Sequence, residues 1–108
     1  MPKYLYQAAY TPQSLAAQIK NPADRLRVVA DQIKSTGVTL VTGGYTFGDY
    51  DIAIIMDAPD DVAMAAVAVA IAAGGAVKSA HTTRMLSGEE YVSALQKAAS
   101  VGYKPSGS

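Results

Sequence analysis

Residues 38–57 read VTLVTGGYTFGDYDIAIIMD and predict two strands joined by a turn. Apolar and polar residues alternate on both sides of Gly48 and Asp49, as they do in strands with one packed face. Glycine as the first of two loop residues fits a type II′ turn, because only glycine adopts the required positive φ without strain. We therefore expect strands at 38–47 and 50–57, with Gly48 and Asp49 as the whole loop.

This loop sets the register of the two strands. The residue pairs on one face are apolar or glycine, namely Phe47–Tyr50, Tyr45–Ile52, Gly43–Ile54 and Val41–Met56. The opposite face is half polar and carries Leu40, Thr42, Gly44, Thr46, Asp51, Ala53, Ile55 and Asp57. The first face should therefore pack, and a bulge at Gly43-Gly44 would shift part of the pairing.

The segments before this hairpin predict a strand and two helices. Residues 3–10 alternate with strand periodicity, which we assign to a central strand. One side of that strand carries Tyr4, Tyr6, Ala8 and Tyr10. Thr11-Pro12 and Asn21-Pro22 each combine an N-cap side chain with proline at the first helical position. We expect a short helix after the first signal and an amphipathic helix from the second signal to Gly37.

The segments after the hairpin predict a helix, a strand and a last helix. Asp60 and Asp61 suit a first helical turn, and Gly74-Gly75 ends the alanine-rich helix that follows. Residues 76–86 are typical of a fourth strand. Ser87, with Glu90 three residues later, predicts a capping box that opens a helix over 88–100.

This order of elements is the split βαβ arrangement of ferredoxin-like α+β folds. In such a fold, helices cover one face of an antiparallel four-stranded sheet and leave the other face open. The 108 residues suffice for one such domain, which we place at 1–100, with a loose C-terminal tail at 101–108.

Two apolar surfaces in this arrangement lack a cover. The alanine-rich helix carries Val67 on one side and Val62 and Val69 nearly opposite, so its second side must meet the C-terminal helix or a second copy of the chain. The open sheet face would expose Leu40 and Ile55. We predict a homo-oligomer, at least a dimer, that associates through the open sheet face as a dimeric α/β barrel.

Composition argues against several classes of function. Nine Lys and Arg balance nine Asp and Glu, so no broad positive field favours nucleic acid or a membrane surface as a partner. The uncharged run at 62–77 is too short and too rich in alanine for a membrane span. The absence of cysteine and of an export signal at 1–10 favours the cytoplasm. We predict no metal site and no cofactor, because the single histidine has no second ligand and no phosphate-binding loop is present.

Three segments of the chain resemble the GYD domain family of small bacterial and archaeal proteins. They are MPKYLYQAAYTPQSLAAQIKNPADR, GYTFGDYDIAIIMDAPDD and GAVKSAHTTRML, in this order. The residues that give the family its name are Gly48, Tyr50 and Asp51, with Asp49 interposed. The resemblance, which extends from Met1 to about Ala99, implies a ferredoxin-like fold and association into oligomers, and it implies no established activity.

Three candidates for a site are present: a loop, a group of tyrosines and one histidine. Gly48, Asp49, Tyr50 and Asp51 form either a ligand corner or, as we prefer, a structural turn, because two carboxylates are too few for a good calcium site. The tyrosines of the first strand, together with Tyr45, either line a pocket or pack the core. His81 is a weak candidate for a catalytic base or a haem ligand. We predict ligand binding by Tyr6, Tyr45, Tyr50 and His81.

Three functions remain open. The one we favour is a small oligomeric binding or accessory protein, which holds a small molecule between its sheet and the sheet of a partner. The second is an enzyme that uses His81 and tyrosines in an interfacial cavity, by analogy with other proteins of this fold. The third is a structural or regulatory assembly without chemistry.

Overall fold

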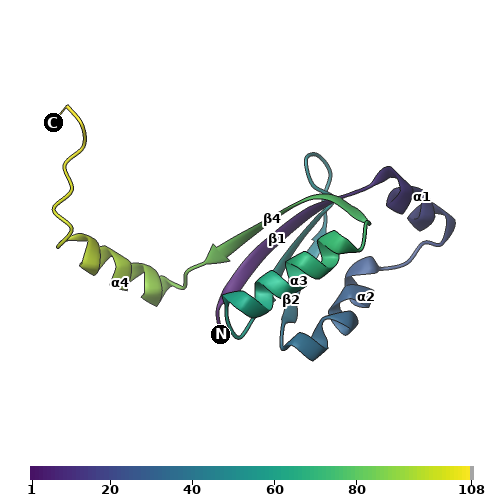
Figure 1. Cartoon of the computed structure of the whole chain (residues 1–108), viewed down its shortest axis with the longest axis horizontal. Coiled ribbons are helices and arrows are strands. Elements are labelled where there is room, and N and C mark those ends of the chain that lie inside the picture. The colour runs from purple at the N-terminus through teal and green to yellow at the C-terminus, as the bar shows by residue number, and fades with distance from the viewer. Residues whose placement is uncertain (108) are drawn as a thin grey trace.

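The computed structural model describes residues 1–107, which form a four-stranded antiparallel sheet and four α-helices (Figure 1). The strands are β1 (Lys3–Tyr10), β2 (Thr39–Tyr45), β3 (Ile52–Asp57) and β4 (Val77–Met85). The helices are α1 (Pro12–Lys20), α2 (Arg25–Gln32), α3 (Asp61–Ala73) and α4 (Gly88–Ala98), and a 3₁₀ turn, η1 (Lys34–Thr36), follows α2. The element order and the sheet order β2-β3-β1-β4 agree with the predicted ferredoxin-like α+β fold, with β1 in the centre.

The hydrophobic core lies on one face of the sheet. The largest fully buried side chains are Tyr6, Ile54, Met56, Met64, Val38 and Val67. Alternate residues of β1 and β3 point to this face, and α2 and α3 both pack on it. Burial of each large apolar side chain contributes roughly 1.5–3 kcal/mol. No second core cluster forms on the opposite face within the described chain.

The register of β2 and β3 is partly as predicted. Two expected pairs are present, Tyr45–Ile52 and Gly43–Ile54. Met56 pairs with Leu40 and not with Val41, because the bulge falls between Leu40 and Thr42 and not at the two glycines. The shift turns Leu40 toward the core, where it is half-buried, so its predicted place on the open face is wrong. Burial of a leucine favours this bulged pairing over a regular ladder.

The connection between β2 and β3 is longer than the predicted two residues. The strand bounds leave residues 46–51 outside both strands. Within this loop the backbone N–H of Thr46 donates to the carbonyl of Asp51 at 2.8 Å. Gly48 has a φ of 117°, so the expectation that glycine supplies a positive φ here is confirmed. The predicted two-residue turn is wrong, because six residues separate the two strands.

Asp51 connects the β2–β3 loop to the central strand β1. Its backbone N–H donates to the carbonyl of Ala8 at 2.8 Å, and its carboxylate accepts the backbone N–H of Tyr10 at 2.8 Å. Asp51 therefore continues the contact with β1 one residue before Ile52, the last β3 residue that pairs with β1, and near the point where the β1–β4 register shifts. The loop therefore serves the central strand as well as its own hairpin.

The helix signals are confirmed except at the start and the end of α2. Thr11 caps α1 by accepting a backbone N–H of the first turn at 3.1 Å. Asn21-Pro22 does not begin a helix: Asn21 ends α1, and Asp24 precedes α2. α2 also ends earlier than predicted, at Gln32, and Gly37 follows η1 instead. Asp61 lies in the first turn of α3 as predicted, whereas Asp60 is its N-cap. Gly74 follows α3, and the Ser87–Glu90 capping box opens α4.

A contact with the edge strand fixes the start of α2. The hydroxyl of Tyr45 donates to the Asp24 carboxylate at 2.5 Å and accepts the backbone N–H of Leu26 at 3.1 Å. The hydrogen bond from Tyr45 lowers the pKa of Asp24, while burial and the same bond raise the pKa of Tyr45. Because this contact joins residues far apart in sequence, the local N-cap pattern could not locate the helix start.

The outer side of α3 and the whole of α4 expose apolar side chains. Val62 and Val69 of α3 are 77% and 68% exposed. α4 stands away from the sheet beyond the end of β4 (Figure 1), and the molecule measures 58 × 34 × 22 Å. Tyr91, Val92 and Leu95 of α4 are exposed as well. The C-terminal helix of the same chain therefore does not provide the second cover that α3 was expected to need.

Gly43→Ala should destabilise the protein, because a Cβ there would lie 2.3 Å from a methyl carbon of Ile54. We expect the free energy of unfolding in urea to fall by about 1–3 kcal/mol, the usual effect of overpacking. The control is Gly44→Ala, whose Cβ would meet no atom within 4 Å. It should change stability little or raise it by roughly 0.4–1 kcal/mol. Equal stabilities of the two variants would contradict the observed register.

Tyr45→Phe should raise the pKa of Asp24 toward its ordinary value, because the hydrogen bond that lowers it is lost. A carboxylate with a lowered folded-state pKa contributes stability above its unfolded-state pKa, and this contribution disappears as the pH falls through the folded-state pKa. The wild type should therefore lose more stability than the variant below about pH 4. Carboxyl NMR titration and urea unfolding measure both effects, with Tyr50→Phe as control. Identical Asp24 titrations in wild type and Tyr45→Phe would argue against the contact.

Candidate functional site

A cavity of about 340 Å³ lies between the sheet and the two helices that cover it. β1 and β3 contribute its floor, including Tyr6 and Ile54, and α2 and α3 contribute its walls. Ala66 and Ala70 line the α3 wall, and their small side chains leave space that a larger residue would fill. A mostly apolar lining with a few polar groups is typical of small-molecule sites.

The hydroxyl of Tyr6 is an unusual group in this cavity. The Tyr6 residue is only 1% exposed, and its hydroxyl has no hydrogen-bond partner among residues 1–107. A buried polar group left without a partner costs about 1–3 kcal/mol, and native proteins keep few of them. Burial raises the pKa of Tyr6, so the hydroxyl stays protonated and can donate near neutral pH.

Tyr10 and Arg25 also line the cavity. Burial raises the pKa of Tyr10, and the guanidinium of Arg25 opposes part of this rise, which puts the two side chains within electrostatic reach. Arg25 forms no ion pair in the part of the chain that the structure describes. No Asp, Glu or His of the described chain is among the lining residues. Donors and a positive charge therefore border the cavity without a carboxylate.

Of the four predicted ligand-binding residues, Tyr6 lines this cavity and the other three lie elsewhere. The hydroxyl of Tyr45 is engaged at the start of α2, and Tyr50 is half-buried in the β2–β3 loop. His81 is exposed on β4 and pairs with Gln7 of β1, so it lies on the sheet face opposite to Tyr6. The structure therefore does not bring Tyr6 and His81 together within one chain.

Gly48, Asp49, Tyr50 and Asp51 lie in the β2–β3 loop, outside the lining of the cavity. Asp51 holds the backbone of Tyr10, and Asp49 is exposed. Among residues 1–107 no three His, Cys, Asp or Glu side chains are grouped so that they could hold a metal ion. None of the helices in this same range is long and apolar enough to cross a membrane.

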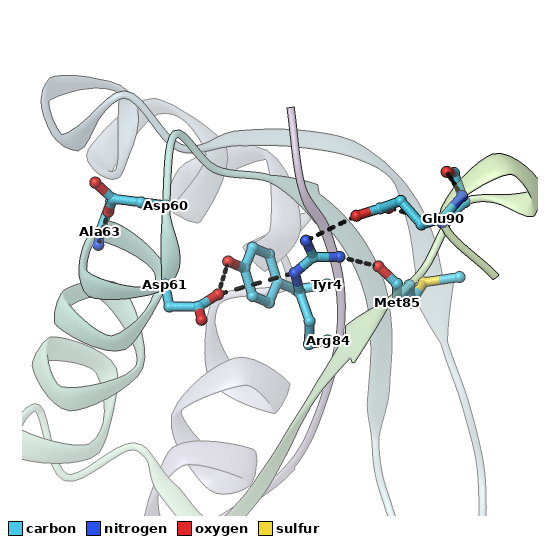
Figure 2. A network of polar contacts seen from close by, with 8 residues as sticks. Tyr4, Asp60, Asp61, Ala63, Arg84, Met85 and Glu90 are labelled. Atoms are coloured by element: carbon cyan, nitrogen blue, oxygen red, sulfur yellow. Dashed lines mark hydrogen bonds and ion pairs between the residues drawn. The ribbon is translucent and has the colours of Figure 1, made fainter. Parts of the chain in front are cut away.

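A polar cluster that the sequence did not single out joins β1, α3, β4 and α4 (Figure 2). The hydroxyl of Tyr4 donates to Asp61, and the Arg84 guanidinium lies 5.8 Å from the centre of the Tyr4 ring. Arg84 also lies 3.9 Å from Asp61 (Nε to Oδ1) and 3.3 Å from Glu90 (Nη2 to Oε2). The bond to Asp61 raises the pKa of Tyr4, whereas the Ser87 N–H and Arg84 lower the pKa of Glu90.

This cluster has a structural role, because its charged and hydroxyl groups pair with one another: Tyr4 with Asp61, and Arg84 with Asp61 and Glu90. Glu90 belongs to the α4 capping box, so Arg84 ties the first turn of α4 to the sheet and to α3. The sequence did contain a signal for this cluster. Arg84 is an odd number of residues from His81 on β4, so the two side chains point to opposite faces of the sheet. Arg84 therefore lies on the core face, where it pairs with Tyr4 of β1. A charged residue on a core-facing position needs a partner.

A comparison with solved structures supports the fold. The crystal structure of MtbAldR matches with a TM-score of 0.58 and 12% sequence identity, and the match covers 80% of this chain and 53% of that chain. This chain therefore spans about half the length of MtbAldR, and at such low identity the likeness shows the fold alone. No curated protein matches the sequence significantly.

The family resemblance drawn from the sequence is confirmed. The family model of the GYD domain matches residues 4–95, which run from β1 into α4. This range includes Gly48, Tyr50 and Asp51 in the β2–β3 loop, and it includes every residue that lines the cavity. The chain belongs to the GYD domain family.

Proposed function

We propose that this protein is a small homo-oligomeric binding protein that holds an apolar small molecule between its sheet and helices α2 and α3. The observation that carries the proposal is the hydroxyl of Tyr6, which is buried beside a cavity and has no partner in the described chain. A bound molecule with a hydrogen-bond acceptor would supply that partner and remove the penalty of leaving the hydroxyl unsatisfied.

The lining of the cavity favours binding over catalysis. General acid–base catalysis needs a group that takes up and releases a proton near neutral pH. Burial raises the pKa values of Tyr6 and Tyr10, so both remain neutral phenols. The described lining contains no histidine or carboxylate that could act in their place. An enzyme based on His81 would have to use the opposite sheet face, where that residue lies.

The proposed oligomer is supported by apolar surface that one chain does not cover. Val62 and Val69 are exposed on α3, and Tyr91 and Leu95 are exposed on α4. Exposed apolar faces of this kind are typical of surfaces that associate. Association through the open sheet face, as in a dimeric α/β barrel, and a cytoplasmic location are predictions from the sequence that we retain in the proposal.

Filling the cavity should abolish binding without unfolding the protein. Ala70 lines the cavity from α3, so Ala70→Phe would place a ring inside it. We expect native mass spectrometry to detect a co-purified molecule on the wild type but not on Ala70→Phe. We also expect the neutral probe naphthalene-1-methanol to shift the methyl NMR signals of Val67 and Ile71, which line the cavity, in the wild type alone.

The control for this experiment is Ala72→Phe, which adds the same ring to α3 outside the cavity lining. It should bind the probe as the wild type does. The binding proposal fails if the wild type retains no molecule and its methyl signals do not respond to the probe.

Leu95→Glu should weaken the oligomer, because an interface that covers the apolar side of α4 would have to bury a carboxylate. We expect light scattering after size-exclusion chromatography to show at least a dimer for the wild type. The dissociation constant of Leu95→Glu should rise by about tenfold or more, as for loss of roughly 1.4 kcal/mol. The matched control is Ser93→Glu, which adds the same charge to the polar side of α4, the side that carries Glu89, Glu90 and Lys97. A monomeric wild type at micromolar concentration would refute this part of the proposal.

A further inference from the structure

We infer that the molecule held in the cavity is an apolar organic acid, whose carboxylate binds where Tyr6, Tyr10 and Arg25 line the cavity and whose body lies against the apolar walls. This inference rests on the proposed function, because it names the ligand class of the same cavity. The cavity could still bind small molecules if this ligand class were wrong.

Gln32 and Thr36 are polar residues of the cavity lining, and the donors that matter for a ligand are the hydroxyl of Tyr6 and the guanidinium of Arg25. The Tyr6 hydroxyl has no partner, and Arg25 forms no ion pair, within residues 1–107. Tyr6, Tyr10 and Arg25 all line this one cavity, and Tyr10 lies within electrostatic reach of the other two side chains. Arginine can only donate hydrogen bonds and always carries a positive charge. A ligand with acceptor oxygens and a negative charge satisfies this set of groups.

Asp24, which precedes Arg25, and Asp51, which binds the backbone of Tyr10, are already engaged by other groups. Asp24 accepts the hydroxyl of Tyr45 and interacts with Arg27, and Asp51 accepts the backbone N–H of Tyr10. Neither carboxylate lines the cavity. Arg25 is therefore left without an internal counter-ion, and a ligand carboxylate can form the charge-assisted bonds that a guanidinium favours.

One positive charge in an apolar cavity matches a singly charged ligand. A phosphate would bring up to two negative charges, and the lining offers one guanidinium to balance them. A cationic ligand would be repelled by Arg25 and would leave the Tyr6 hydroxyl without a strong acceptor. The carboxylate is the common organic group that carries one charge and two acceptor oxygens.

The remaining lining requires an apolar body. Ile54, Val67 and Ile71 face the cavity together with alanines of α3. A volume of about 340 Å³ lies at the small end of known ligand pockets, which span roughly 300–1,000 Å³. The acid should therefore be a small one, with a body of one or two rings or a medium-length hydrocarbon chain.

Three probes with one body and different head groups test this inference on the full chain. They are 1-naphthoate, naphthalene-1-methanol and naphthalene-1-methylammonium, each titrated by isothermal calorimetry. We expect 1-naphthoate to bind at least about tenfold more tightly than the alcohol, and the ammonium compound to bind most weakly, because a charge-assisted bond to Arg25 is available to the acid alone.

Two variants assign the effect to named residues. Arg25→Gln should lower the affinity for 1-naphthoate by about tenfold and leave the affinity for the alcohol unchanged. Arg27→Gln, on the same helix but outside the cavity lining, is the control and should bind like the wild type. Tyr6→Phe should weaken binding of 1-naphthoate and raise the melting temperature of the ligand-free protein, because it removes an unsatisfied buried hydroxyl.

The outcomes separate the inference from the proposed function. Equal affinities for the acid and the alcohol, or an unchanged acid affinity in Arg25→Gln, would overturn the ligand class while the cavity remains a binding site. A Tyr6→Phe variant that is less stable without ligand and binds the acid normally would show that the hydroxyl serves the core alone. Absence of binding by all three probes would overturn the inference and count against the proposed function as well.

Discussion

The central strand places three tyrosines on the core face of the sheet, and each must bury a ring while its hydroxyl remains satisfied. Tyr4 donates to Asp61 at the start of α3, and Tyr10 lines the cavity together with Arg25. Tyr6, between them, meets neither helix through its hydroxyl, because a cavity separates α2 from α3 above it. The Tyr6 ring is therefore buried while its hydroxyl has no partner in the described chain, and the cavity contains a free hydrogen-bond donor.

The residues that name the family support the sheet close to that cavity. Gly48 adopts a positive φ in the loop, and Asp51 binds the backbone of both Ala8 and Tyr10. Regular β1–β3 pairing ends at Ala8, so without Asp51 the Tyr10 N–H would lose its acceptor. The loop thus positions the end of β1, and with it the Tyr10 side chain that borders the cavity.

Periodicity and capping signals predicted the element order because these signals are local. The misses all depend on contacts between distant segments. Leu40 turns inward because a bulge brings it opposite Met56, and α2 starts after Asp24 because Tyr45 of the edge strand binds there. The strand pattern could place Tyr6 on a face with other tyrosines, but the space above it depends on how two helices diverge. The presence of this cavity therefore could not be predicted from a local sequence pattern.

The proposed binding site and the proposed association surfaces occupy different parts of the molecule. The cavity lies on the helix-covered face, whereas His81 and Ile55 lie on the open face and α4 projects beyond the end of β4 (Figure 1). Arg84 fixes the first turn of α4 through Glu90, so this helix is held in a direction that keeps its apolar side off its own sheet. An amphipathic helix whose apolar side faces away from its own sheet is suited to contact a second copy. Since the lining of the cavity comes from one chain, the cavity does not need assembly to form.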